Sequence, residues 1–391
     1  MIGVVSVYAF VSIFLIMAFF LGIIHKNKTP KISILIYLLF LTIMMAANVN
    51  NPDYYNYLKS YNYIEALKGS EWGYYYLAKF CSNLGVGYHQ FKFIIAILGL
   101  LLIHSTVRRY LKKCTLFYLL YFLCPFMIDA TQLKNFLAMS FFIFAVPFLT
   151  ESTLKGKLKY VLLIVMAASF QITAFVYLPI AFLGNVEKNK LIKLILIIVI
   201  ILSVVIGLNR SFVIYLAGLI SSSLGNFDDR IIEFSSVDTT YGFIIYWGLQ
   251  IISFFLIKWA KKSYENSYQE DIQEKLLINN KNFEYKLIKL LDVINIYSFI
   301  FLPFYVIQLT YGRFLRNILP LNYIILILAY RKNKVVEGKI TLHTTLMFSS
   351  LIIYAVLNFY FMIYMEYNDT IIKPLFTDNW FLNMNWHEWF S

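Results

Sequence analysis

The sequence predicts an all-α, polytopic integral membrane protein with about 10–12 transmembrane helices. Several apolar runs reach the roughly 18–20 residues that a helix needs to cross a bilayer. Hydrophobic residues make up 60% of the chain, whereas only 14% are charged. The net charge of +13 does not indicate a nucleic-acid partner, because the basic residues are placed as membrane topology requires.

The predicted spans are separated by polar or basic segments. They cover residues 2–24, 32–48, 89–107, 114–130, 135–150, 191–207, 242–258, 287–309, 314–330 and 341–365. The first run has no basic segment before it and no small-residue cleavage site after it, so we expect a retained span and not a removed signal peptide. No repeat or soluble domain is visible, and residues 1–391 are interpreted as a single membrane domain.

Lysine and arginine gather on one side of these spans. Residues 26–31, 108–113, 155–159, 188–193, 258–289 and 331–339 hold 24 of the 34 basic residues. By the positive-inside rule this side is cytoplasmic, which places both termini outside. An outer functional loop at 48–88, a cytoplasmic linker at 259–286 and an outer C-terminal tail at 366–391 follow. At the inner end of its span, Asp292 is expected to pair with Lys289.

Residues 160–184 are apolar but too short for two full crossings, and both of their flanks are basic. A re-entrant pair of short helices, broken near Ser169-Phe170-Gln171, satisfies both facts. Broken backbone at membrane depth is tolerated where it is buried in protein or lines a water-filled cavity. The alternative is one ordinary span here and another at 212–225, which would leave three lysines outside.

The most unusual stretch is Asn48–Tyr76, which combines eight tyrosines and Trp72 with the carboxylates of Asp53, Glu65 and Glu71. Tyrosine and tryptophan present apolar faces with a polar edge. That chemistry suits stacking against sugar rings, and it equally suits a position at the level of the lipid headgroups. A sugar-handling site and an interfacial aromatic belt therefore both remain open.

Three of the basic residues on the outer side share a geometry. Lys134 lies at the start of an inward-running helix, and Arg313 and Arg316 lie at the start of another. The helix dipole places partial positive charge at these positions, so cations there are disfavoured unless an anion is close. They therefore indicate a phosphate site, and the alternative is that all three extend to lipid phosphates.

Four short motifs, in this order, resemble the EpsG-type branch of the Wzy-like O-antigen and exopolysaccharide polymerases. They are Asp53-Tyr54-x-x-Tyr57, Glu71-x-Gly73-Tyr74, Lys134 with Asn135-Phe136-Leu137-Ala138, and Ser169-Phe170-Gln171-Ile172-Thr173-Ala174 followed by Pro179. The family usually has arginine where this chain has Lys134, and histidine where it has Gln171. Lysine keeps the charge but lacks the planar fork of arginine, and glutamine cannot act as a base.

The resemblance implies a membrane polysaccharide polymerase on the outer face of the bacterial cytoplasmic membrane. It would transfer a growing glycan from polyprenyl diphosphate to a new lipid-linked oligosaccharide repeat unit. Asp53 or Glu71 would be the general base, with Asp53 preferred, and the diphosphate would contact Lys134, Arg313 and Arg316. The residues expected to contact sugar are Tyr54, Tyr57, Trp72, Tyr74 and Gln171.

No metal or cofactor is expected, because no D-x-D pair, P-loop, Rossmann glycine cluster or H-E-x-x-H motif occurs. The expected partners are the lipid-linked oligosaccharide and membrane lipids, with a chain-length regulator and a flippase as further candidates. Two alternative functions stay open: a lipid-linked oligosaccharide flippase, and a ligase that moves a finished glycan to another acceptor. The product could be capsule, O-antigen or exopolysaccharide.

Overall fold

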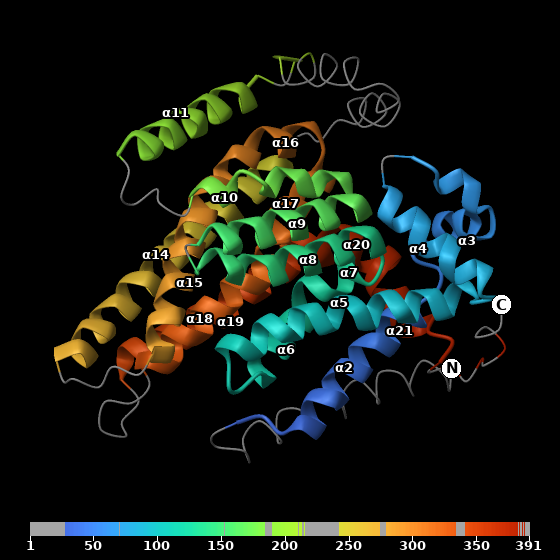
Figure 1. Cartoon of the computed structure of the whole chain (residues 1–391), viewed down its shortest axis with the longest axis horizontal. Helices are drawn as coiled ribbons and strands as arrows, with labels where there is room; N and C mark the ends of the chain where they lie inside the picture. The colour runs from blue at the N-terminus through green and yellow to red at the C-terminus, as the bar shows by residue number, and fades with distance from the viewer. Residues whose placement is uncertain are drawn as a thin grey trace. The chain divides into compact units, whose positions relative to one another are not determined.

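A computed structural model describes most of the chain (Figure 1). The described residues are 28–69, 71–151, 153–183, 190–209, 211–212, 215, 242–273, 279–333, 341–381, 383, 385 and 387. All regular secondary-structure elements within them are helices. Five helices are long and apolar enough to cross a membrane: Tyr88–Tyr110, Gly242–Asn266, Phe283–Val306, Thr310–Lys332 and Leu342–Thr377. The prediction of an all-α polytopic membrane protein is confirmed.

Five shorter apolar helices accompany them. They are Lys31–Ala46, Thr115–Asp129, Leu133–Leu149, Ile172–Leu183 and Leu194–Gly207. Predicted span 2–24 and most of the alternative span at 212–225 lie outside the described residues, as do parts of the predicted linker and tail.

The helices form two compact units, Met1–Ala181 with Leu351–Ser391, and Phe182–Ser350. Helix α19 (Leu342–Phe359) continues from the second unit into the first. The expectation of one polytopic domain stays a prediction.

The first unit is built around α8, which has α5 and α9 on its two sides (Figure 1). Its main helices are α2 (Lys31–Ala46), α3 (Tyr54–Asn62), α4 (Trp72–Asn83), α5 (Tyr88–Tyr110), α6 (Thr115–Tyr121), α8 (Leu133–Leu149), α9 (Leu154–Phe170) and α21 (Lys373–Thr377). Helix α8 is apolar around most of its circumference and is therefore buried. A Cβ at Gly99 of α5 would lie 2.4 Å from the Phe136 ring, so this glycine lets α5 approach α8 closely.

The predicted break near residue 171 is present. Helix α9 ends at Phe170, Gln171 is extended (φ −144°, ψ 109°), and a 3-10 helix follows at Ile172–Tyr177. The hydroxyl of Tyr160 donates to the carbonyl of Tyr177 at 2.7 Å. In a straight helix these residues would stand roughly 25 Å apart at about 1.5 Å per residue, so the chain turns back along α9.

The second unit contains α11 (Lys190–Gly207), α14 (Gly242–Gln273), α15 (Asn279–Tyr297), α16 (Leu302–Ile307), α17 (Arg313–Arg316) and α18 (Leu319–Asn333). Its interior includes a buried amide pair between α15 and α18. Asn295 donates to Asn322 at 2.8 Å, and Asn322 donates back at 3.1 Å. Because each amide supplies what the other needs, the pair fixes how these two helices are aligned.

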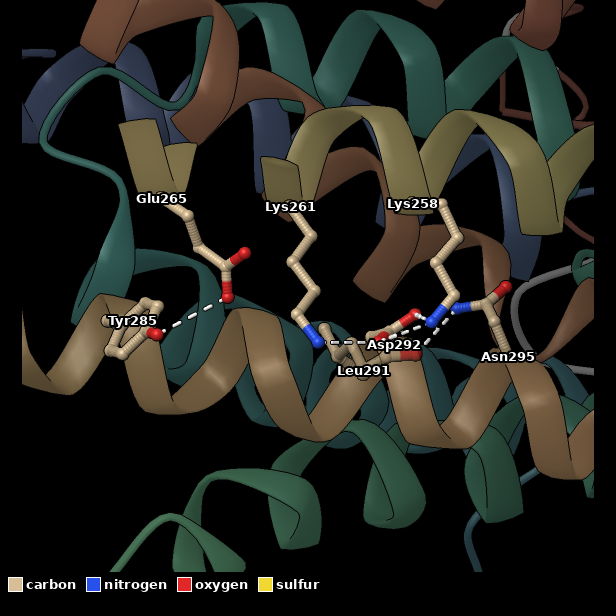
Figure 2. Close-up of polar contacts among 7 residues, drawn as sticks. All are labelled: Lys258, Lys261, Glu265, Tyr285, Leu291, Asp292 and Asn295. Carbon is tan, nitrogen blue, oxygen red and sulfur yellow. Dashed lines mark hydrogen bonds and ion pairs between the residues drawn. The ribbon is translucent and has the colours of Figure 1, made fainter. Parts of the chain in front are cut away.

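A second polar contact joins α14 to α15 (Figure 2). Asp292, whose side chain is 3% exposed, receives the ammonium groups of Lys258 and Lys261, each at 2.8 Å. The expected pairing with Lys289 is wrong, because the ammonium of Lys289 lies over the Tyr285 ring. Helical spacing allows the local pair, but the carboxylate of Asp292 faces α14, where two lysines reach it.

Candidate functional site

The segment that leads into α3 is shaped by three asparagines. Asn50 has a left-handed backbone (φ 59°), which asparagine tolerates better than most residues. The amide of Asn51 donates to the side-chain oxygen of Asn48 at 2.6 Å. The oxygen of Asn51 in turn accepts the backbone N–H of Asp53 at 3.1 Å. This turn (residues 48–53) places Asp53 at the N-cap position of α3. The side chain of Asp53 is half-buried and makes no capping hydrogen bond.

The tyrosines of α3 and α4 pack against one another and against the start of α5. The ring pairs are Tyr54–Tyr88, Tyr57–Tyr74, Tyr61–Phe91 and Tyr74–Phe91, with centroids 4.8–6.1 Å apart. Tyr54 and Tyr74 are buried, so most of their surface serves this packing. Burial raises the pKa of Tyr74 well above its usual value, with Tyr57 and Glu71 adding to the shift, and its phenol is therefore a donor and not a base.

The other residues expected to contact sugar keep more of their surface open. Trp72 is 48% exposed, and Tyr57 and Gln171 are half-buried. Among the three carboxylates of residues 48–88, that of Glu65 forms an exposed ion pair with Lys79 at 2.9 Å. The hydrogen bond from Lys79 lowers the pKa of Glu65.

Glu71 and Lys134 form the most enclosed ion pair of this region. The ammonium of Lys134 lies 2.6 Å from Oε2 of Glu71, and the two side chains are only 16% and 13% exposed. The same ammonium lies over the ring of Tyr74 at 4.8 Å and that of Tyr57 at 5.9 Å. Lys134 is in the first turn of α8, where the helix dipole disfavours a cation. Glu71 supplies the anion that this position was expected to need.

Gly73 brings α4 against the end of α9. A Cβ at this position would lie 2.1 Å from the Oγ of Ser169, so any larger residue would push the helices apart. Ser169 is two residues before the break at Gln171. The motif at 71–74 therefore meets the motif at 169–171, although nearly 100 residues separate them in the chain.

The structure thus brings Tyr57, Glu71, Tyr74 and Lys134 into direct contact. Tyr54 packs on Tyr88 and joins this group only through neighbouring rings, and Asp53 lies at the start of the helix that carries Tyr54 and Tyr57. The Gly73–Ser169 contact places the broken segment against the same helix as Glu71. These residues all belong to the first unit.

Arg313 and Arg316 belong to the second unit, near the start of the apolar helical segment Thr310–Lys332. They occupy the four-residue helix α17, which follows a 3-10 helix at Leu309–Gly312. Arg313 donates through Nε to the carbonyl of Thr310 at 3.0 Å, and Arg316 is buried. A Cβ at Gly312 would clash with the Tyr246 ring at 2.1 Å, so this turn is packed tightly on α14. A turn at residues 317–318 separates α17 from α18 within Thr310–Lys332, so the helix dipole at the two arginines is weaker than in an unbroken helix.

Two residues of α5 that the sequence reasoning missed lie beneath this site. Lys92 is 1% exposed and donates to the backbone carbonyl of Asn48 at 2.5 Å. His89 is also buried and contacts the hydroxyl of Tyr54 at 3.2 Å. The available signal was a lone lysine inside an apolar span, which is rare unless the residue has a specific role.

No curated protein and no solved structure matches the chain significantly. A family model described as the EpsG family matches residues 31–375, and the chain therefore belongs to the EpsG family.

Proposed function

We propose that this chain polymerises lipid-linked oligosaccharide repeat units on the outer face of the bacterial cytoplasmic membrane. EpsG family membership supports a polymerase-like role in polysaccharide synthesis. The observation that carries the finer proposal is the enclosed Glu71–Lys134 ion pair. It joins two of the sequence motifs beside aromatic side chains, one of which is Tyr57, one helical turn after Asp53 on α3.

In the proposed reaction, a hydroxyl of the new repeat unit attacks the anomeric carbon of the growing glycan. The bond between that carbon and the diphosphate oxygen breaks as the glycosidic bond forms, and polyprenyl diphosphate leaves with the bonding electrons. Asp53 accepts the hydroxyl proton as the general base. We assign this role to Asp53 because an oxygen of Glu71 already accepts a hydrogen bond from Lys134.

The charge that develops on the leaving diphosphate needs cationic groups. Lys134 is proposed for this role, with Glu71 holding its ammonium in place until the substrate arrives. Arg313 and Arg316 are proposed as further diphosphate ligands, since these two basic residues lie one helical turn apart in the sequence of α17. Tyr57, Trp72 and Gln171 are the proposed sugar contacts with the most open surface.

The test is the glycan pattern of the host bacterium after deletion of the gene, with the wild-type gene restored as the control. A polymerase defect leaves single repeat units on lipid at the outer face. Long chains stranded on lipid would identify a ligase, and repeat units trapped at the inner face would identify a flippase. Either of the last two patterns would overturn the proposal.

A further inference from the structure

The C-terminal end of the described chain pairs with the turn that precedes Asp53. The N–H of Val49 donates to the carbonyl of Asp378 at 2.9 Å, and the N–H of Trp380 donates to that of Ala47 at 3.1 Å. The side chain of Asn50 adds a hydrogen bond to the carboxylate of Asp378 at 3.2 Å. We call residues 378–380 the C-terminal strap. It lies about 330 residues from the turn in sequence and beyond the family-matched range.

Lys92 also holds this turn through a hydrogen bond. Its ammonium donates to the carbonyl of Asn48 at 2.5 Å and lies over the rings of Tyr54 and Tyr88 at 5.4 and 5.7 Å. Among the described residues these partners are neutral. Burying an ammonium group removes it from water and is unfavourable, so an apolar side chain would be more stable here if packing were the only requirement. We therefore attribute the lysine at this position to the hydrogen bond that its ammonium donates to the turn.

A continuous chain of hydrogen bonds leads from this lysine to Asp53. Lys92 holds the backbone carbonyl of Asn48, and the side chain of Asn48 accepts from Asn51. The side chain of Asn51 then accepts the backbone N–H of Asp53. Asn48 and Asn51 are both buried, so water does not readily replace these bonds.

His89, one turn before Lys92 on α5, links the strap to the next residue of the motif. The indole N–H of Trp380 lies 3.1 Å from Nδ1 of His89. Nδ1 also lies 3.4 Å from the carbonyl of Ala46, which can only accept. The indole contact is shorter and an indole nitrogen can only donate, so Nδ1 is assigned as the acceptor and the ring proton as residing on Nε2. Nε2 then donates to the hydroxyl of Tyr54 at 3.2 Å. The strap thus contacts the turn through its backbone and Tyr54 through Trp380.

We propose that Lys92 is a positioning residue for glycan transfer, and that it acts with His89 and the C-terminal strap by fixing the backbone from which Asp53 projects. This inference rests on the proposed role of Asp53 as the general base. It assigns no contact with substrate to Lys92, because that side chain is enclosed by protein.

The test compares four full-length variants in the gene-deleted host: Lys92→Met, Trp380→Phe, Asp53→Asn and Lys92→Met combined with Asp53→Asn. Lys373→Met is the matched control, since Lys373 makes an exposed ion pair with Asp369 outside this network. Polymer yield is normalised to the amount of protein in the membrane fraction. Hydrogen exchange of the purified proteins measures how well residues 47–53 are held.

We expect Lys92→Met to speed amide exchange in residues 47–53 at least about tenfold and to leave α8 protected. Polymer yield should fall by about tenfold or more, whereas Lys373→Met should match the wild type. Trp380→Phe keeps the ring but loses the indole donor, and should show the same pattern more weakly. If Lys92 acts through Asp53, the double variant should be no less active than Asp53→Asn alone.

Two outcomes overturn the inference and leave the proposed function intact. One is an inactive Asp53→Asn protein beside a Lys92→Met protein with normal yield. The other is a double variant whose yield falls by the product of the two single losses, because Lys92 would then act independently of Asp53. Normal polymer from Asp53→Asn would instead remove the proposed general base, and the inference with it.

Discussion

Replacing Glu71 by glutamine leaves the Lys134 ammonium enclosed without its counter-charge. At 2.6 Å and an effective dielectric constant of about 20, the lost attraction is about 6 kcal/mol. Several kcal/mol of this loss are offset, because burying a neutral amide has a smaller desolvation penalty than burying a carboxylate. The amide oxygen also keeps a hydrogen bond of about 1 kcal/mol. The expected net loss of stability is about 2–3 kcal/mol, or roughly 2–4 °C in melting temperature for a chain of this length.

The assay is thermal unfolding of the purified protein in detergent, for Glu71→Gln, Lys134→Gln and the double variant. The double variant should be more stable than the sum of the single losses indicates, with a coupling energy of about 2 kcal/mol. A coupling energy below about 0.5 kcal/mol would refute the view that this pair is enclosed and strong.

The exchanged pair, Glu71→Lys with Lys134→Glu, separates structure from function. It should regain part of the stability, because the opposite charges still face each other. It should make no normal polymer, because the cation has moved away from the start of α8. Normal polymer from the exchanged protein would mean that the pair is structural only, and Lys134 would lose its proposed role at the diphosphate.

Four further changes have definite expected outcomes. Asp53→Asn should keep the protein in the membrane and slow polymer formation by about 10²–10⁴-fold, as expected for a general base, when polymer length is measured on gels. Arg313→Lys and Arg316→Lys should each be only partly active in the same assay, because lysine lacks the planar fork. A cysteine at Lys59 should react with an impermeant reagent in intact spheroplasts, because the outer loop is predicted to face outside. Asp292→Asn should lower the melting temperature by several degrees, because two lysines lose their shared carboxylate.

Each of these expectations can fail in a specific way. Normal polymer from Asp53→Asn would favour the alternative interpretation of Asn48–Tyr76 as an interfacial aromatic belt. Full activity of both lysine variants would mean that the two arginines serve only generic contacts with headgroups. Labelling at residue 59 only after permeabilisation would mean that the predicted topology is reversed. An unchanged melting temperature for Asp292→Asn would mean that the ion pairs of Asp292 do not stabilise the protein.

Features governed by local chemistry could be predicted from the sequence. Apolar run length predicted the apolar helices of the described residues, and the short apolar stretch 160–184 with its basic flanks predicted the break at Gln171. Motif order predicted the family, and the roles of the motif residues stay predictions. The structure adds that Glu71 and Lys134, assigned separately to catalysis and to the diphosphate, are partners in one ion pair.

Features governed by packing could not be predicted in the same way. Tyrosine is equally suited to stacking on a sugar and to packing in a core, so composition alone does not indicate that Tyr54 and Tyr74 are buried. The partner of Asp292 depends on which face of α15 meets α14, and helical spacing favoured the wrong lysine. The role of Lys92 depends on a turn more than 40 residues earlier in the chain.

The β-bridge between Asn48 and Asn379 has a consequence for protein engineering. A chimera assembled at the edge of the family-matched range would combine the loop of one parent with the tail of another. The main-chain hydrogen bonds across the junction could form with any sequence, but the Asn50–Asp378 and His89–Trp380 contacts depend on particular side chains. Functional chimeras should therefore inherit both ends of the bridge from the same parent. A fusion partner attached directly after residue 377 would displace the strap, so a tag is better placed elsewhere in the chain.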